Sequence, residues 1–162
     1  GGFPAPPHKC TIWYMITSST VTIDAPADLV WQVFTDVQRW PEWTASVNRL
    51  VGLDGPDLAV GRRFEIDQPR LPRLQWTVTE LVEDTSWTWV QTSPGGRTTA
   101  RHDVVANPDG TTEVRQVLDQ GGVIGGLVGR MMRSMTQRYL EMEGQGLKRR
   151  SEELSKHRGP AT

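Results

Sequence analysis

The chain has little of several features that would mark a particular class of protein. Cys10 is the only cysteine among 162 residues, so no disulfide can form within the chain and no thiolate cluster can bind a metal. The formal net charge is −1, which gives no general attraction to nucleic acid or to an anionic membrane. The apolar run at residues 11–16 is too short to span a bilayer. We therefore expect a cytoplasmic protein with no nucleic-acid partner and no integral membrane association.

What the chain does contain is enough apolar material for one core. Hydrophobic residues make up 36% of the sequence, charged residues 23%, and seven residues are tryptophan. A chain of this length buries roughly 70% of its unfolded surface, which suits a single domain. The first ten residues are rich in glycine and proline. We expect an N-terminal extension or leader at residues 1–17, one domain at 18–156 and a tail at 157–162.

Residues 20–43 combine a strand with two short helices. Val21 and Ile23 alternate with polar neighbours, as in a half-buried strand. Pro26 is suited to a helix start, and the helix that follows has an apolar stripe. The stripe consists of Leu29, Val30, Val33, Phe34 and Val37. Trp40 and Trp43 then flank Pro41 in a second short helix.

The rest of the chain reads as a meander of strands followed by a helix. Turn residues separate six expected strands at 46–53, 62–68, 74–83, 86–92, 98–106 and 111–120. From Val123 the apolar period becomes helical, with spacings of three and four. The predicted helical stripe is Ile124, Val128, Met131, Met135, Tyr139 and Met142.

The segment VTIDAPADLVWQVFTDVQRWPEW and the order of elements after it resemble the START-like, birch-pollen-allergen-like superfamily, in its polyketide cyclase/dehydrase and lipid-transport family. The resemblance covers about residues 18–156. It implies an α+β helix-grip fold: a curved antiparallel sheet of about seven strands wrapped around a long C-terminal helix, with two short helices after strand 1. Such a sheet leaves a cavity against the helix unless large side chains fill it.

The candidate ligand-binding residues come from the helix, the strands and the second short helix. Methionine adapts to irregular apolar ligands, although a methionine stripe at helical spacing equally suits a plain core. Tryptophan likewise fills cores or stacks on ligands, and alternation alone does not decide which strand face points inward. The predicted ligand-binding set is Trp43, Trp76, Trp89, Gln116, Met131, Met135, Tyr139 and Met142.

His102 is the candidate catalytic residue, because its ordinary pKa lies near neutrality. Alternation puts it on one face with Ala100 and Val104, away from its charged neighbours. A hydrogen-bonded core histidine is the competing interpretation.

Two functions follow from the resemblance. The first is binding of a hydrophobic small molecule, such as a lipid, isoprenoid or polyketide. The alternative is a polyketide aromatase/cyclase or dehydratase acting on a poly-β-ketone, for which we expect an inward arginine chosen from Arg63, Arg101 and Arg115. We expect no cofactor, no metal, and a monomer or homodimer. The adaptable methionine wall favours binding.

Overall fold

The computed structural model describes residues 13–159, which form one antiparallel sheet with helices packed on it. The seven strands lie in the order β1-β7-β6-β5-β4-β3-β2. The strands are β1 (Trp13–Ile23), β2 (Arg49–Gly52), β3 (Arg63–Asp67), β4 (Leu74–Val82), β5 (Ser86–Ser93), β6 (Gly96–Ala106) and β7 (Thr112–Gly122). The helices are α1 (Ala27–Thr35), the 3₁₀ helix η1 (Val37–Glu42), α2 (Gly125–Met131) and α3 (Arg133–Arg158). This is the predicted α+β helix-grip fold.

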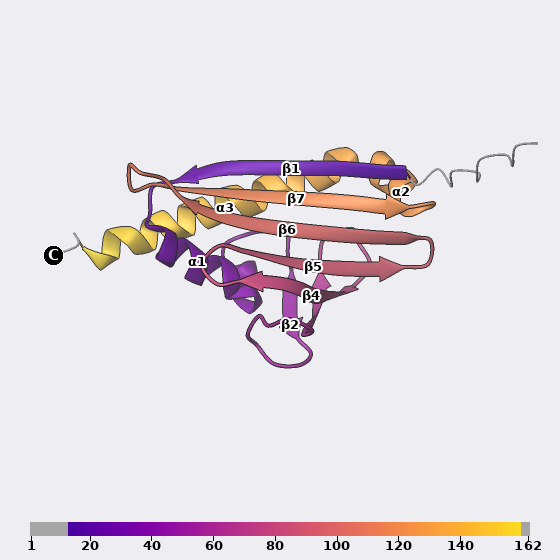
Figure 1. Ribbon diagram of the computed structural model, residues 1–162, viewed down its shortest axis with the longest axis horizontal. Helices are drawn as coiled ribbons and strands as arrows, with labels where there is room; N and C mark the ends of the chain where they lie inside the picture. The colour runs from indigo at the N-terminus through magenta and orange to yellow at the C-terminus, as the bar shows by residue number, and fades with distance from the viewer. Residues whose placement is uncertain (1–12, 160–162) are drawn as a thin grey trace, which may run out of the picture.

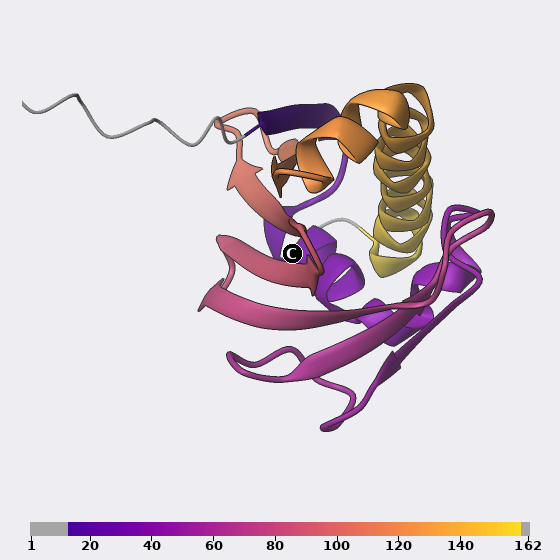
Figure 2. The same cartoon turned by 90° about the vertical axis from the view of Figure 1, so that its right-hand side faces the viewer.

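The sheet curves around one side of the molecule and α3 closes the other. Figure 1 shows α3 running along the back of the sheet, with α2 near the start of β1. Figure 2, turned by 90°, shows the strands bending away from α3, so that sheet and helix face each other across an interior. A register shift between Val78 and Glu80, where β4 pairs with β5, contributes to the bend.

The first strand is longer than predicted. β1 begins at Trp13 and pairs with β7 along its whole length, from Trp13 opposite Gly122 to Ile23 opposite Thr112. Residues 13–17, which we expected in the N-terminal extension, therefore belong to the sheet. The alternation signal is weak there because β1 is an edge strand and both Tyr14 and Ile16 are exposed.

The predicted long helix is two helices. The backbone at Met132 leaves the helical region (φ −99°, ψ 9°), so α2 ends before α3 begins. The predicted stripe is therefore not one continuous face, and Met131 is 78% exposed. No helix within residues 13–159 has the length and apolarity needed to cross a membrane.

The middle of α3 is anchored by close packing. Its buried residues all lie between Leu140 and Ser151. A Cβ atom on Gly146 would lie 2.1 Å from the carbonyl oxygen of Trp43, so only glycine allows the helix to pass the end of η1 at this distance. A Cβ atom on Gly144 would meet Ser19 and Val21 at an ordinary 3.6 Å.

We predict opposite effects for alanine at these two glycines. Gly146→Ala should lower the free energy of unfolding by about 1–3 kcal/mol, because backbone must move to admit the methyl group. Gly144→Ala should be neutral or raise it by up to about 1 kcal/mol, since alanine favours the helix and no clash results. Urea unfolding of both variants measures this. Equal effects would contradict the proposed close approach.

Candidate ligand-binding cavity

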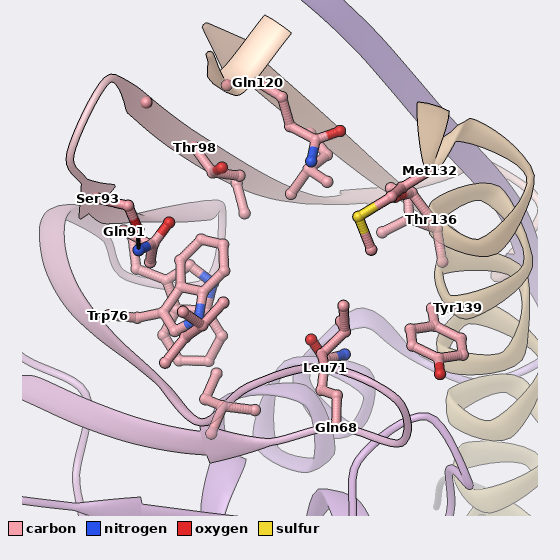
Figure 3. A pocket seen from close by; sticks show the side chains of 18 of the residues that line it. Gln68, Leu71, Trp76, Gln91, Ser93, Thr98, Gln120, Met132, Thr136 and Tyr139 are labelled. Carbon is pink, nitrogen blue, oxygen red and sulfur yellow. Dashed lines mark hydrogen bonds between the residues drawn. The ribbon is translucent and has the colours of Figure 1, made fainter. Parts of the chain in front are cut away.

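A cavity of about 290 Å³ lies between the sheet and the first turns of α3. Figure 3 shows Trp76 and Gln120 on the sheet side, Tyr139 on α3, and Gln68 and Leu71 on the loop between β3 and β4. The hydroxyl of Tyr139 donates to the carbonyl of Pro69, which ties this loop to the helix. The apolar lining residues include Trp40, Val47, Ile66, Leu71, Leu74, Trp76, Trp89, Leu118, Ile124, Val128, Met132, Met135 and Leu140.

The closed end of the cavity is aromatic. The Trp87 ring stacks on His102 with centroids 3.7 Å apart, and Trp89 meets Trp87 edge to face at 4.6 Å. Trp76 lies 5.8 Å from Trp89, and Phe34 packs on His102 at 5.3 Å. The β5 face that carries both tryptophans and the β6 face that carries His102 therefore point inward, which the sequence left undecided.

His102 is a neutral, packed histidine. It is 3% exposed, and in its neutral form Nδ1–H donates to the Trp87 carbonyl at 3.2 Å. Burial among these rings lowers the pKa of His102 to about 3, because the charged imidazolium loses its hydration. The imidazole is thus a weak base at neutral pH, which supports the core-histidine interpretation rather than proton transfer.

Gln116 and Glu143 form a polar floor in this apolar cavity. Gln116 Nε2 donates to the Leu140 carbonyl at 3.3 Å, while Gln116 Oε1 is buried and has no partner among the described residues. Glu143 follows Leu140 by three residues, so it lies one helical turn further along α3. His102 is directly opposite Gln116 in the β6–β7 register. All three polar side chains line the cavity.

Glu143 is an uncharged carboxylic acid at neutral pH. Its side chain is buried, and Oε1 accepts a hydrogen bond from Ser46 Oγ at 3.2 Å. Burial raises the pKa of Glu143 from 4.5 to about 8, outweighing the opposing effect of the Ser46 hydrogen bond. At neutral pH the carboxyl group can donate a hydrogen bond as well as accept one.

The structure separates the predicted ligand-binding residues into two groups. Trp76, Trp89, Gln116, Met135 and Tyr139 line the cavity. The other three do not: Trp43, Met131 and Met142. Trp43 is instead buried against Trp40 and Gly146. The break at Met132 turns Met131 outward and brings Met132 to the lining.

The three arginines proposed for cyclase chemistry have exposed side chains. Arg63 pairs with Asp54 at 2.8 Å, and Arg101 pairs with Asp103 at 3.0 Å. Arg101 is also among the residues that line the cavity, whereas Arg63 and Arg115 are not. Within residues 13–159, no group of three acidic, histidine or cysteine side chains is arranged to hold a metal.

Sequence reasoning missed Glu143, although a signal was present. Leu140, Gly144, Leu147 and Ser151 recur at spacings of four, three and four, which marks the inward face of α3. Glu143 lies on that face between Leu140 and Leu147. The predicted stripe of methionines lies on a neighbouring face of the helix, which does not include Glu143.

The fold and the enclosed apolar cavity define a helix-grip protein of the START and birch-pollen-allergen type. The family described as polyketide cyclase/dehydrase and lipid transport matches residues 15–152, and the chain belongs to this family. No curated protein sequence matches the chain.

Solved structures of the same fold have little sequence identity to the chain. A point mutant of norcoclaurine synthase from Thalictrum flavum, in complex with a transition-state analogue, aligns with a TM-score of 0.72 and 10% identity, covering 93% of this chain and 100% of that one. A START superfamily protein from Mycobacterium smegmatis has a TM-score of 0.68, 18% identity and coverage of 86% and 98%. A hypothetical protein from Helicobacter pylori has a TM-score of 0.71, 15% identity and coverage of 85% and 88%. At these identities the similarity shows the fold alone.

From the raised pKa of Glu143 we predict how the free energy of unfolding depends on pH. Between pH 4.5 and about 8 the Glu143 carboxyl group keeps its proton in the native state and loses it in the unfolded chain, so the contribution of Glu143 to the free energy of unfolding should fall as pH rises through this window. Glu143→Gln should remove this contribution, and its stability relative to wild type should therefore increase from about pH 5 to about pH 8. Urea unfolding at several pH values measures the difference. Other groups, including His102, titrate in both proteins and cancel, so a difference that does not vary with pH would contradict the assignment.

Proposed function

We propose that this protein binds a hydrophobic small molecule, such as a lipid, an isoprenoid or a polyketide-like compound, in the cavity between the sheet and α3. The observation that carries the proposal is the cavity itself, about 290 Å³ with tryptophans on its walls. A core serving stability alone would be filled to the density of organic crystals. Space bounded by indole rings and methionines favours apolar guests because transferring them out of water is favourable.

The polar floor supports a narrower ligand class. Gln116 Oε1 lacks a donor among the described residues, and leaving a buried acceptor unpaired is costly. Glu143, as an uncharged acid, offers a donor on the opposite wall of the same cavity. A hydroxyl group satisfies both, since it donates to the amide oxygen and accepts from the acid. The favoured ligand is therefore a neutral apolar molecule that carries an alcohol or phenol.

Binding is preferred over the alternative of a polyketide aromatase/cyclase or dehydratase. Proton movement on a poly-β-ketone needs a group that changes protonation near neutral pH or a cation that stabilises an enolate. His102 is held neutral by burial, and Arg63 and Arg101 are each paired with an aspartate. Arg97 and Arg101 lie at the cavity lining, but both are exposed to solvent, which weakens the stabilisation of an enolate. Glu143 could exchange a proton, but as a protonated acid it can donate a hydrogen bond to a ligand without any proton transfer.

Filling the cavity should block binding. Thr136 lies on the α3 wall, whereas Gln145 lies on the exposed side of the same helix. Thr136→Phe should weaken binding of the apolar dye ANS by about tenfold or more, since a loss of about 1.4 kcal/mol is tenfold in affinity. The matched control Gln145→Phe should bind as wild type does. Fluorescence titration measures both, with circular dichroism to verify folding; saturable binding that Thr136→Phe leaves intact would place the dye outside the cavity.

The hydroxyl preference can be tested with two isoprenoids that differ in one group. Wild-type protein should bind farnesol about five- to tenfold more tightly than farnesene, the gain expected from a buried hydrogen bond of about 1–1.5 kcal/mol. Gln116→Leu should remove most of this preference while leaving farnesene affinity unchanged, which is the internal control for an intact cavity. Displacement of ANS measures the affinities. Equal affinity for the two compounds in wild type would contradict the polar floor as a recognition element, even if both bind.

A further inference from the structure

A group of exposed apolar residues surrounds α2. Of the twelve large hydrophobic residues that are exposed in the described chain, five lie within nine consecutive positions. These five, which we call the α2 patch, are Val123 (61% exposed), Ile124 (54%), Leu127 (57%), Val128 (40%) and Met131 (78%). Isolated exposed apolar side chains are ordinary on protein surfaces, but a contiguous group marks an interaction site.

Positive charge accompanies the α2 patch. Arg130 lies in α2 and Arg133 is the first residue of α3. The backbone of Arg97 lies beside the first turn of α2, since a Cβ atom on Gly125 would be 3.4 Å from the Arg97 backbone nitrogen. These three arginines form no ion pair with any residue at positions 13–159, whereas Arg63 and Arg101 do. The sequence has no acidic residue between Asp119 and Glu141. The chain as a whole has a net charge of −1, so this basic surface is local.

The α2 patch borders the cavity. Ile124 and Val128 line the cavity as well as reaching solvent, and Met132 continues the lining at the junction with α3. The start of α2 is held in place because the Gly95 carbonyl accepts hydrogen bonds from the nitrogens of Ile124 and Gly125 at 2.8 and 3.1 Å. Figure 2 shows α2 at the end of the molecule where β1 begins, alongside α3. The α2 helix thus separates the cavity from the outside at this end.

We propose that the α2 patch docks on the surface of an anionic lipid bilayer. Leu127 and Met131 would enter the boundary between headgroups and acyl chains, as the apolar face of an interfacial helix does. An arginine near such a surface is attracted to the anionic headgroups. Arg97, Arg130 and Arg133 supply this attraction at the place where the apolar residues are exposed.

The charge pattern argues against the other common occupant, a second copy of the chain. A symmetric dimer places the same patch on both partners, so the unpaired arginines of one copy would face those of the other. Like charges brought together at an interface oppose association. A bilayer that contains anionic lipid has the complementary charge and an apolar interior, and it matches both properties of the patch.

The test is co-sedimentation of the full chain with vesicles of phosphatidylcholine, with and without phosphatidylglycerol. We expect wild-type protein to sediment mainly with the anionic vesicles, and binding to fall as salt is raised. Leu127→Glu combined with Met131→Glu should reduce the bound fraction about tenfold, since both apolar contacts are replaced by repelled charges. Arg130→Glu combined with Arg133→Glu should abolish the dependence on phosphatidylglycerol.

The control carries the same substitution at exposed valines elsewhere. Val82→Glu combined with Val105→Glu changes two residues that are 56% and 52% exposed on other strands, and it should bind vesicles as wild type does. Circular dichroism verifies folding of every variant. The proposal is overturned if wild type fails to bind anionic vesicles or if the control loses binding equally. It is also overturned if light scattering shows that the α2 variants dissociate a dimer while vesicle binding is absent.

Discussion

The cavity depends on the way the tight packing of α3 begins only at Leu140. From Leu140 to Ser151 the helix is packed tightly, and Gly146 brings it against the Trp43 carbonyl. Lys148 reinforces this half by donating to the Thr22 carbonyl at 2.9 Å. The turns before Leu140 are only half-buried and face the sheet across open space. Because α3 packs tightly only from Leu140 onward and the sheet opposite is curved, a gap remains between the sheet and the first turns of α3, and the candidate site occupies that gap.

The electrostatics of the cavity follow from the same packing. Aromatic rings surround His102 and exclude water, which makes a charged imidazole costly. Glu143 lies at the point where the packed half of α3 meets the cavity, and burial favours its protonated form in the same way. The closed end therefore carries hydrogen-bonding groups without charge. A ligand with a carboxylate would have to give up its hydration there without meeting a cation, whereas a neutral hydroxyl would not.

The sequence was sufficient for the architecture, because strand alternation and helix periodicity are local signals. The predicted strands at 98–106 and 111–120 pair as β6 and β7, and Leu29, Val30 and Phe34 of the predicted stripe are buried in α1. Trp31, which the predicted stripe left out, is buried as well, and Val33 is half-buried. Two features depended on tertiary contacts that no local pattern records. The break at Met132 occurs inside a stretch whose apolar residues keep helical spacing from Val128 to Met135, and β1 extends to Trp13 because β7 offers a full-length partner. For the site, the lining face of β5 and β6 was undecidable from alternation, and Glu143 went unnoticed because a carboxylate usually marks a solvated position.

The α2 patch and the cavity have a common physical rationale. A molecule apolar enough to prefer this cavity is also one that partitions into membranes, so its concentration in water is low and its concentration in a bilayer is high. A protein that takes such a molecule from water would bind it slowly, because few molecules are dissolved there. A protein docked on the bilayer would lie where the molecule is concentrated. Ile124 and Val128 belong both to the exposed patch and to the cavity lining. If the α2 patch is docked on a bilayer, a movement of these two side chains would connect the cavity to the lipid. An apolar ligand could then enter the cavity without passing through water.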